Sequence, residues 1–232
     1  MLRFFSMLGA ALLLVPFGAR ADMPVVVELY TSQGCSSCPP ADALLVEMAS
    51  HEYVIALALH VDYWDYLGWV DIFANPAFSN RQRLYAQQWG KRTVYTPQMV
   101  VQGVDYMVGS RSDEIQRQIM QAEGREARVS LSAQSNGGGI RIELAPLGAG
   151  LAMADIQLVR YSAGESVTIE HGENAGKTIE YVNIVKSWEI LARWDGKGPT
   201  VVNVPQVEAG EYVIIIQAPG PGEIYAAARL SH

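Results

Sequence analysis

Cysteine is scarce in this chain, which has only two, Cys35 and Cys38, among 232 residues. Two cysteines cannot form a disulfide scaffold, and a chain of this length does not need one because it can bury a core of its own. Clusters of basic residues are also missing, since 17 Lys and Arg stand against 24 Asp and Glu, a net charge of −7. A nucleic-acid surface needs such clusters to displace counterions, so we expect no nucleic-acid partner.

Long apolar runs are absent as well. The runs AALLLV and VIALALHV are too short to cross a bilayer as helices, so we expect no membrane span after signal cleavage. The N-terminus has the features of a secretory signal: Arg3 supplies the positive charge, residues 4–17 the apolar segment and Ala19-Arg20-Ala21 the cleavage site. Residues 1–21 are therefore predicted to be a signal peptide cleaved after Ala21, with a buried N-terminal helix as the alternative. Cleavage would place the mature protein in the periplasm or outside the cell, where disulfides persist.

Residues 22–125 alternate between strand-like and helix-like patterns, which predicts an α/β domain with a mixed sheet and flanking helices. Short β-rich apolar runs indicate strands, and apolar residues three or four positions apart indicate helices. The predicted elements are strands over 24–30 and 52–62, a helix beginning near the cysteines, a helix over 75–90, two strands within 96–109, and a helix starting near Ser112.

Residues 126–232 lose the helical period. They carry seven or eight short strand-like runs, separated by turn sequences such as SNGGG and APGPG. Strands at this spacing are typical of an antiparallel β-sandwich. We therefore predict an independent all-β, sandwich-like domain, with a continuation of the first sheet as the alternative.

The two cysteines follow the first predicted strand and open a predicted helix, in a Cys-x-x-Cys motif. A helix N-terminus favours thiolate over thiol because it presents free N–H groups and a partial positive charge. In this arrangement Cys35 is the nucleophile that attacks a substrate disulfide, and Cys38 resolves the mixed disulfide. The alternatives are an inert clip and half of a zinc site. The chain has no second Cys-x-x-Cys or His pair to complete such a site, so we expect no metal.

Thr96-Pro97 stands before the apolar run QMVV, well after the cysteines. A Cys-x-x-Cys motif opening the first helix, with a residue-Pro pair before a later strand, resembles the two-part site of the thioredoxin superfamily. The segments YTSQGCSSCPPAD, HVDYWDYLGW, RQRLYAQQWG and VYTPQMVVQG resemble more closely a family of exported bacterial proteins catalogued as domain of unknown function 1223, thioredoxin-like in fold. The resemblance implies a cis bond before Pro97. It also implies that Pro97 lies against the cysteines and that Thr96 offers backbone groups to an extended substrate peptide.

Glu28, on the first predicted strand, resembles the buried acid that moves protons to and from the inner cysteine of thioredoxins. The resemblance implies a general base for Cys38, and the alternative is a side chain that points to solvent. The motif departs from ordinary thioredoxins in two places. Gly34 stands where they usually carry tryptophan, and the intervening pair is Ser36-Ser37. Since an uncharged hydroxyl stabilises a thiolate less than an imidazolium does, we favour a reductase or isomerase over a strong oxidant.

Residues 62–69 form an aromatic loop after the second predicted strand, and ligands of α/β sheets gather beyond the carboxyl ends of strands. Tyr63 and Trp64 are therefore candidates for substrate binding, with core packing as the alternative.

Together these features predict an exported thiol–disulfide oxidoreductase. It would act on protein thiols and disulfides with an unidentified redox partner, and it needs no cofactor because Cys35 and Cys38 carry the electrons. Two other classes stay open. One is a Cu(I)-handling module, in which His60 or Met99 adds a third ligand to the two thiolates. The other is a non-catalytic binding protein with a structural disulfide.

Overall fold

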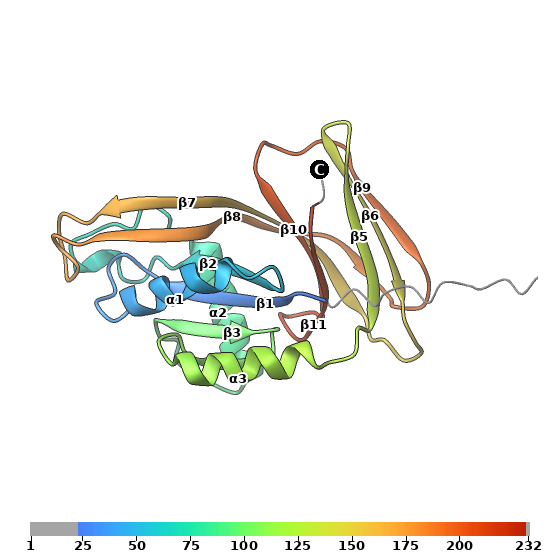
Figure 1. Ribbon diagram of the computed structural model, residues 1–232, viewed down its shortest axis with the longest axis horizontal. Coiled ribbons are helices and arrows are strands. Elements are labelled where there is room, and N and C mark those ends of the chain that lie inside the picture. The colour runs from blue at the N-terminus through green and yellow to red at the C-terminus, as the bar shows by residue number, and fades with distance from the viewer. Residues whose placement is uncertain (1–22, 231–232) are drawn as a thin grey trace, which may run out of the picture.

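The computed structural model describes residues 23–230, so the predicted signal peptide lies outside the described residues. The chain has a mixed α/β fold with a large mixed sheet and a second, small antiparallel sheet (Figure 1). Among residues 23–230, no helix is long and apolar enough to cross a membrane.

The first half of the chain follows the predicted order of elements. β1 lies inside the sheet, pairing in parallel with β2 and antiparallel with β3. The elements are β1 (Val25–Thr31), α1 (Pro39–Ala49), β2 (Val54–His60), the 3-10 turn η1 (Asp65–Leu67), α2 (Pro76–Gln88), β3 (Gln98–Val101), β4 (Asp105–Val108) and α3 (Ser112–Glu123).

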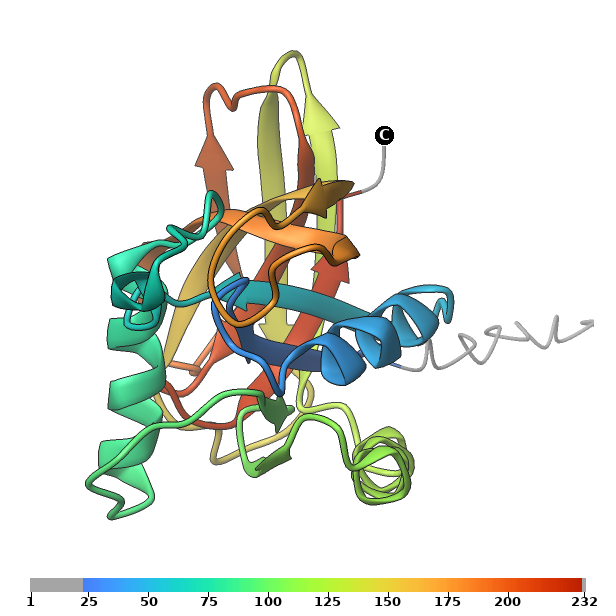
Figure 2. The same cartoon turned by 90° about the vertical axis from the view of Figure 1, so that its left-hand side faces the viewer.

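Helices cover both faces of this part of the sheet, with α2 on one side and α1 and α3 on the other (Figure 2). Successive side chains of a strand point to opposite faces. Val25, Val27 and Leu29 of β1 therefore pack with Leu45 of α1 and Ile115 of α3 in one apolar cluster. The alternate positions of β1 pack against α2 in a second cluster.

The second half of the chain continues the same sheet. Its strands are β5 (Val129–Asn136), β6 (Gly139–Pro146), β7 (Ala154–Thr168), β8 (Thr178–Trp194), β9 (Thr200–Val204), β10 (Glu211–Gln217) and β11 (Ile224–Arg229). The large sheet has the order β11-β10-β7-β8-β2-β1-β3-β4, and β8 joins β2 in parallel through Ala58 and Ile184. The expectation of an independent second domain is corrected on this point. Without β8, β2 would present an edge of unpaired N–H and C=O groups, and β8 covers that edge.

A sandwich-like arrangement is found at one end of the molecule. β5, β6 and β9 form the small antiparallel sheet. Its inner residues Ile140 and Ile142 pack against Ile156, Ile214 and Ile216 of the large sheet. The strands of the second half therefore belong to two sheets. β7, β8, β10 and β11 extend the sheet of the first half, and β5, β6 and β9 form a sheet of their own.

β7 and β8 form a long hairpin of 15 and 17 residues that runs along the first half of the chain (Figure 1). β7 joins two of the strand-like runs predicted from the sequence, ADIQLVRYSA and ESVTIE. The hairpin tip, residues 169–177, lies against the cysteine turn although 139 residues separate Asn174 of the tip from Cys35 in the sequence.

Candidate functional site

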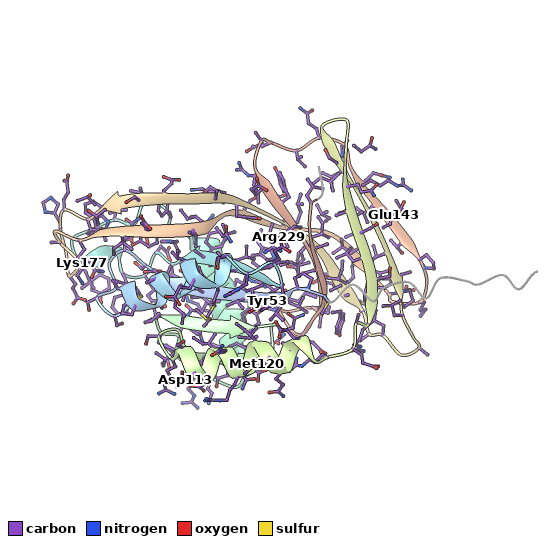
Figure 3. All side chains as sticks on the ribbon, in the orientation of Figure 1. Tyr53, Asp113, Met120, Glu143, Lys177 and Arg229 are labelled. Atoms are coloured by element: carbon purple, nitrogen blue, oxygen red, sulfur yellow. A yellow bond between two sulfur atoms is a disulfide. The ribbon has the colours of Figure 1, made fainter. Side chains whose placement is uncertain are left out.

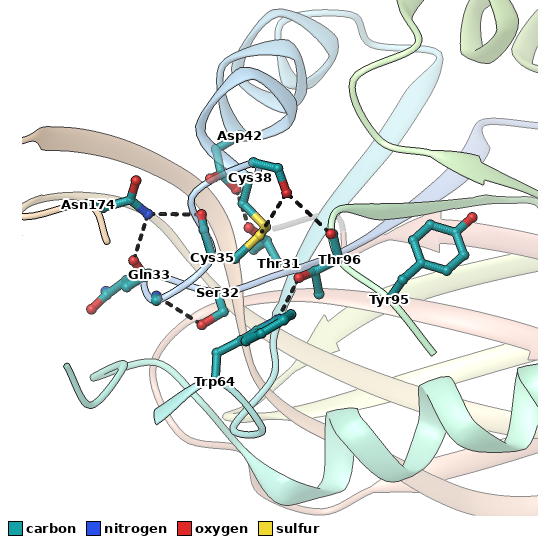
Figure 4. The surroundings of a disulfide bond; sticks show 12 residues. Thr31, Ser32, Gln33, Cys35, Cys38, Asp42, Trp64, Tyr95, Thr96 and Asn174 are labelled. Carbon is teal, nitrogen blue, oxygen red and sulfur yellow. Dashed lines mark hydrogen bonds between the residues drawn. A yellow bond between two sulfur atoms is a disulfide. The ribbon is translucent and has the colours of Figure 1, made fainter. Parts of the chain in front are cut away.

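The two cysteines lie between the carboxyl end of β1 and the N-terminus of α1, and they form a disulfide (Figure 4). α1 begins with Pro39, which is tolerated in a first turn because no intrahelical N–H bond is lost there. The cysteine turn is closed by two backbone bonds, from Cys35 N–H to the Ser32 carbonyl at 3.1 Å and from Cys38 N–H to the Cys35 carbonyl at 3.2 Å. Cys35 is 4% exposed and Cys38 is 0% exposed, so Cys35 is the outer of the two.

Ser37 and Thr96 flank Cys35. Ser37 Oγ lies 3.4 Å from Cys35 Sγ and donates to the Thr96 carbonyl at 3.5 Å. The peptide bond between Thr96 and Pro97 is cis, as predicted. Trp64 Nε1 donates to Thr96 Oγ1 at 2.7 Å. The structure thus gathers the Thr-Pro pair, one aromatic residue of the loop and the disulfide in one place.

Gly34 lets the aromatic loop approach the cysteine turn. A Cβ on Gly34 would lie 3.2 Å from both the Cβ and the carbonyl oxygen of Trp64, so a side chain there would have to push Trp64 away. Tyr63 lies beside Trp64, with ring centroids 5.7 Å apart. Its hydroxyl donates to Gln82 Oε1 of α2 at 3.0 Å and also interacts with the Thr96 side chain. Tyr63 therefore takes part in packing between the loop and α2.

Glu28 is buried, but it lies on the face of the sheet opposite to α1. Its carboxylate accepts two bonds of 2.8 Å from Arg81, and the hydroxyls of Tyr30 and Tyr85 donate to it at 2.9 and 2.7 Å. Because side chains alternate along β1, Glu28 faces α2 while Cys38 stands at the start of α1. The predicted role of Glu28 as a general base for Cys38 is therefore corrected: Glu28 belongs to a buried ion pair.

Asp42 is the buried carboxyl group one turn along α1 from Cys38 (Figure 4). Its N–H donates to the Cys38 carbonyl at 3.1 Å, and its side chain accepts from Thr31 Oγ1 at 2.7 Å. Burial raises the pKa of Asp42 from 3.8 to about 7, although His60 and the bond from Thr31 act in the opposite direction. A carboxyl group that titrates near neutral pH can take up and return a proton during a reaction.

A buried polar cluster surrounds Asp42 at the carboxyl ends of the strands. His60 Nδ1, at the end of β2, lies 2.7 Å from Asp71 Oδ2, which also accepts from the Gln33 N–H at 2.8 Å. The ring of Tyr181 from β8 meets that of His60 at 4.9 Å between centroids. Among the described residues, Asp42 Oδ2, His60 Nε2 and the Tyr181 hydroxyl are buried without a hydrogen-bond partner. Burying such atoms without a partner costs stability.

The hairpin tip contributes Asn174, a buried residue that touches the cysteine turn (Figure 4). Asn174 Nδ2 donates to the carbonyls of Gln33 and Cys35, both at 2.9 Å. Its Oδ1 accepts from Lys177 Nζ at 2.8 Å. A residue of the second half thus holds the backbone on either side of Gly34.

The candidate copper ligands, Met99 and His60, have other partners in the structure. Met99 is buried in the apolar cluster beneath α1, and His60 is held by Asp71. Over residues 23–230, no group of three or more His, Cys, Asp and Glu side chains is arranged to hold a metal ion.

Residues 26–217 match the family described as Protein of unknown function (DUF1223). The chain belongs to this family. A protein from Agrobacterium tumefaciens, solved by X-ray crystallography, is similar at 33% identity with a TM-score of 0.78, over 91% of this chain and 96% of that one. HBP35 of Porphyromonas gingivalis is similar in fold alone, at 14% identity with a TM-score of 0.61, over 90% of this chain and 74% of that one. Among curated proteins, none matches this chain.

In this DUF1223 protein, the predicted residues divide into two groups. Those that the structure brings together are Cys35, Cys38, Trp64, Thr96 and Pro97. Tyr63 lies at the edge of this group, against Trp64, and Glu28 is placed elsewhere. The residues that the sequence analysis missed are Asp42, Asp71 and Asn174. Of these, Asp42 had a usable signal, since it lies one helical turn after Cys38.

Proposed function

We propose that this protein is an exported thiol–disulfide oxidoreductase with a thioredoxin-like first half, using Cys35 and Cys38 as its dithiol. The observation that carries the proposal is a Cys-x-x-Cys disulfide at a helix N-terminus, with the Ser37 hydroxyl and the Thr96 carbonyl beside the outer cysteine. A helix N-terminus stabilises a thiolate, and exposed backbone groups beside it can hold an extended peptide. The order β1-α1-β2, then β3-β4 and α3 supports the thioredoxin-like assignment.

In the reductive direction, the Cys35 thiolate attacks one sulfur of a substrate disulfide. A mixed disulfide forms and the first substrate thiolate leaves. Cys38, after losing its proton, attacks Cys35 Sγ, so that the Cys35–Cys38 disulfide forms and the second substrate thiolate leaves. Two electrons pass from the dithiol to the substrate. The two substrate thiolates take up protons from the solvent, one of which was released there when the Cys35 thiolate formed. An external dithiol donor reduces the disulfide for the next cycle.

Asp42 is the group that we assign to the Cys38 proton. It lies one turn along α1, it is held by Thr31, and burial raises its pKa to about 7. The proton that Cys38 loses passes to the Asp42 carboxylate, and it returns when the disulfide is opened. Glu28 takes no part, because Arg81 holds it on the other face of the sheet.

The polar side chain next to Cys35 Sγ is Ser37, which carries no charge. It stabilises a thiolate less than an imidazolium would, so the proposed activity is that of a reductase or isomerase and not of a strong oxidant. The substrates are protein thiols and disulfides in the periplasm or outside the cell, as the predicted signal peptide implies. The dithiol carries the electrons, so the reaction requires no cofactor.

Equilibration in glutathione buffers of graded potential tests the proposal. Thiols trapped at each potential should show a reversible two-electron transition between about −120 and −270 mV, the range of known exchangers. Cys35→Ser should abolish reduction of a protein disulfide, and Cys38→Ser should accumulate the mixed disulfide. A pair that stays oxidised below about −300 mV would be structural, and the proposal would fail.

A structural disulfide is the second candidate, because Cys35 is only 4% exposed. In that case Cys35→Ser would lower the free energy of unfolding and change no exchange rate. The glutathione titration separates the two candidates directly.

A further inference from the structure

The hairpin tip, residues 169–177, makes several contacts besides those of Asn174. Its two ends are joined by Ile169 N–H to the Lys177 carbonyl at 2.9 Å. Gly172 sits against the aromatic loop, since a Cβ there would lie 3.3 Å from Trp69 Cβ. An apolar cluster anchors the base of the tip, made of Phe73, Ile169, Ile179, Tyr181 and Ile184. The tip therefore has anchors of its own besides the two bonds from Asn174.

Both polar atoms of the Asn174 side chain, Nδ2 and Oδ1, have hydrogen-bond partners. An amide nitrogen has two hydrogens, and Asn174 Nδ2 uses both, on the carbonyls of Gln33 and Cys35. Its Oδ1 accepts from the Lys177 ammonium, which lies at the tip of the long hairpin (Figure 3). The Cys35 carbonyl also accepts from Cys38 N–H, so Asn174 binds the same carbonyl that closes the cysteine turn.

Lys177, Asn174 and the carbonyls of the cysteine turn are joined so that each positive end meets a negative one. The positive Lys177 lies behind the amide oxygen of Asn174, and the positive N–H ends of that amide face the carbonyl oxygens of the turn. Asn174 and Thr96 stand on opposite sides of the cysteines (Figure 4). The amide therefore neutralises the negative ends of two peptide dipoles next to Cys35, where they would otherwise oppose a thiolate.

The two redox states need these bonds to different extents. In the oxidised protein the disulfide itself keeps the turn closed, so the bonds of Asn174 add to a covalent constraint. In the dithiol the covalent constraint is gone, and hydrogen bonds alone, those from Asn174 among them, hold Cys35 at the helix N-terminus. Asn174 therefore contributes more to the dithiol than to the disulfide.

We propose that Asn174, with Lys177 behind it, is a positioning residue for the dithiol: it fixes the carbonyls of the cysteine turn and so favours the reduced form with a Cys35 thiolate. This inference rests on the proposed function of the same site. It makes the tip of the second-half hairpin a part of the redox site.

Three variants test the inference: Asn174→Ala, Lys177→Met and Glu173→Gln. Glu173→Gln is the control, because it also removes one charge from the exposed tip but leaves the bonds of Asn174 intact. Two quantities are measured: the equilibrium constant with glutathione, and the rate at pH 7 of Cys35 alkylation in the reduced protein. Asn174→Ala should shift the equilibrium about three- to tenfold toward the disulfide, the worth of one net hydrogen bond, and slow alkylation by a similar factor. Lys177→Met should shift both in the same direction by less, and Glu173→Gln should move neither in that direction.

The inference is wrong if Asn174→Ala destabilises both redox forms equally and leaves the equilibrium and the alkylation rate unchanged. If Asn174→Ala does not fold, Asn174→Ser and Lys177→Met decide by the same two measurements. A wild-type disulfide that glutathione cannot open contradicts the proposed function. Alkylation after reduction by a stronger dithiol still measures the contribution of Asn174 in that case, so the two failures are distinguishable.

Discussion

Replacing Arg81 with methionine should destabilise the protein strongly, because it leaves a buried carboxylate without its cation. Arg81 makes two bonds of 2.8 Å to Glu28, whose side chain is 0% exposed. Its guanidinium also stacks on Trp188, at 3.6 Å from the ring centroid. Removing one partner of a buried ion pair costs about 3–5 kcal/mol of unfolding free energy.

The cost should fall as the pH falls. A glutamate left without a cation can take up a proton, which for an ordinary glutamate costs about 4 kcal/mol at pH 7 and about 1.4 kcal/mol less for each pH unit below that. Arg81→Met should therefore lose about 4 kcal/mol at pH 7 and about 1–2 kcal/mol at pH 5. Urea unfolding of variant and wild type at pH 5, 6 and 7 measures this difference.

Two further variants control the experiment. Arg141→Met breaks an exposed pair with Glu143 and should cost less than about 1 kcal/mol, independent of the buried-charge effect. Glu28→Gln combined with Arg81→Met should recover most of the loss, because no carboxylate is then left alone. A loss below about 1 kcal/mol for Arg81→Met at pH 7, or the same loss at pH 5, would refute the reasoning.

Three more predictions follow from the site. Asp42→Asn should stabilise the protein by up to about 4 kcal/mol at pH 8 and hardly at pH 4. Burial raises the pKa of Asp42 from 3.8 to about 7. The protonated Asp42 therefore adds its full contribution to the free energy of unfolding below pH 3.8, and this contribution is lost as the pH rises through about 7. Unfolding at both pH values checks this, and an equal gain at both would contradict it. Trp64→Phe removes the bond to Thr96 Oγ1 and should cost about 1 kcal/mol in thermal or urea unfolding, while unchanged stability would show that bond to be dispensable. Tyr181→Phe removes a buried hydroxyl without a partner and should be neutral or stabilising by about 1 kcal/mol, whereas a clear loss of stability would reveal a bond that the hydroxyl makes.

Local patterns were enough for much of the first half. The period-2 and period-3.6 repeats located β1, α1, β2 and α2, because these patterns reflect which residues of one short segment face the core. The Cys-x-x-Cys motif and the Thr-Pro pair are also local, and both lie at element ends where backbone groups are free. Sequence alone was therefore enough to identify the cysteine pair and the Thr-Pro pair beside it.

Placement across the sheet could not be obtained in this way. The sequence showed that Glu28 is an acid on an apolar strand. Which helix covers which face of that strand depends on the packing of the whole sheet. In the structure Glu28 faces α2 instead of Cys38. The second half was expected to fold separately. Pairing between β2 and β8 is a long-range contact, and no feature of either strand by itself specifies its partner.

The contact between Asn174 and Cys35 shows the same limit most clearly, since 139 residues separate them. A long hairpin had to continue the sheet and dock on the aromatic loop before Asn174 could reach the cysteine turn. The sequence determined that two cysteines begin a helix, because helix-starting signals act within a few residues. Only the tertiary structure decided that Asp42 and Asn174 surround them, because burial and long-range hydrogen bonds exist only once the sheet is assembled.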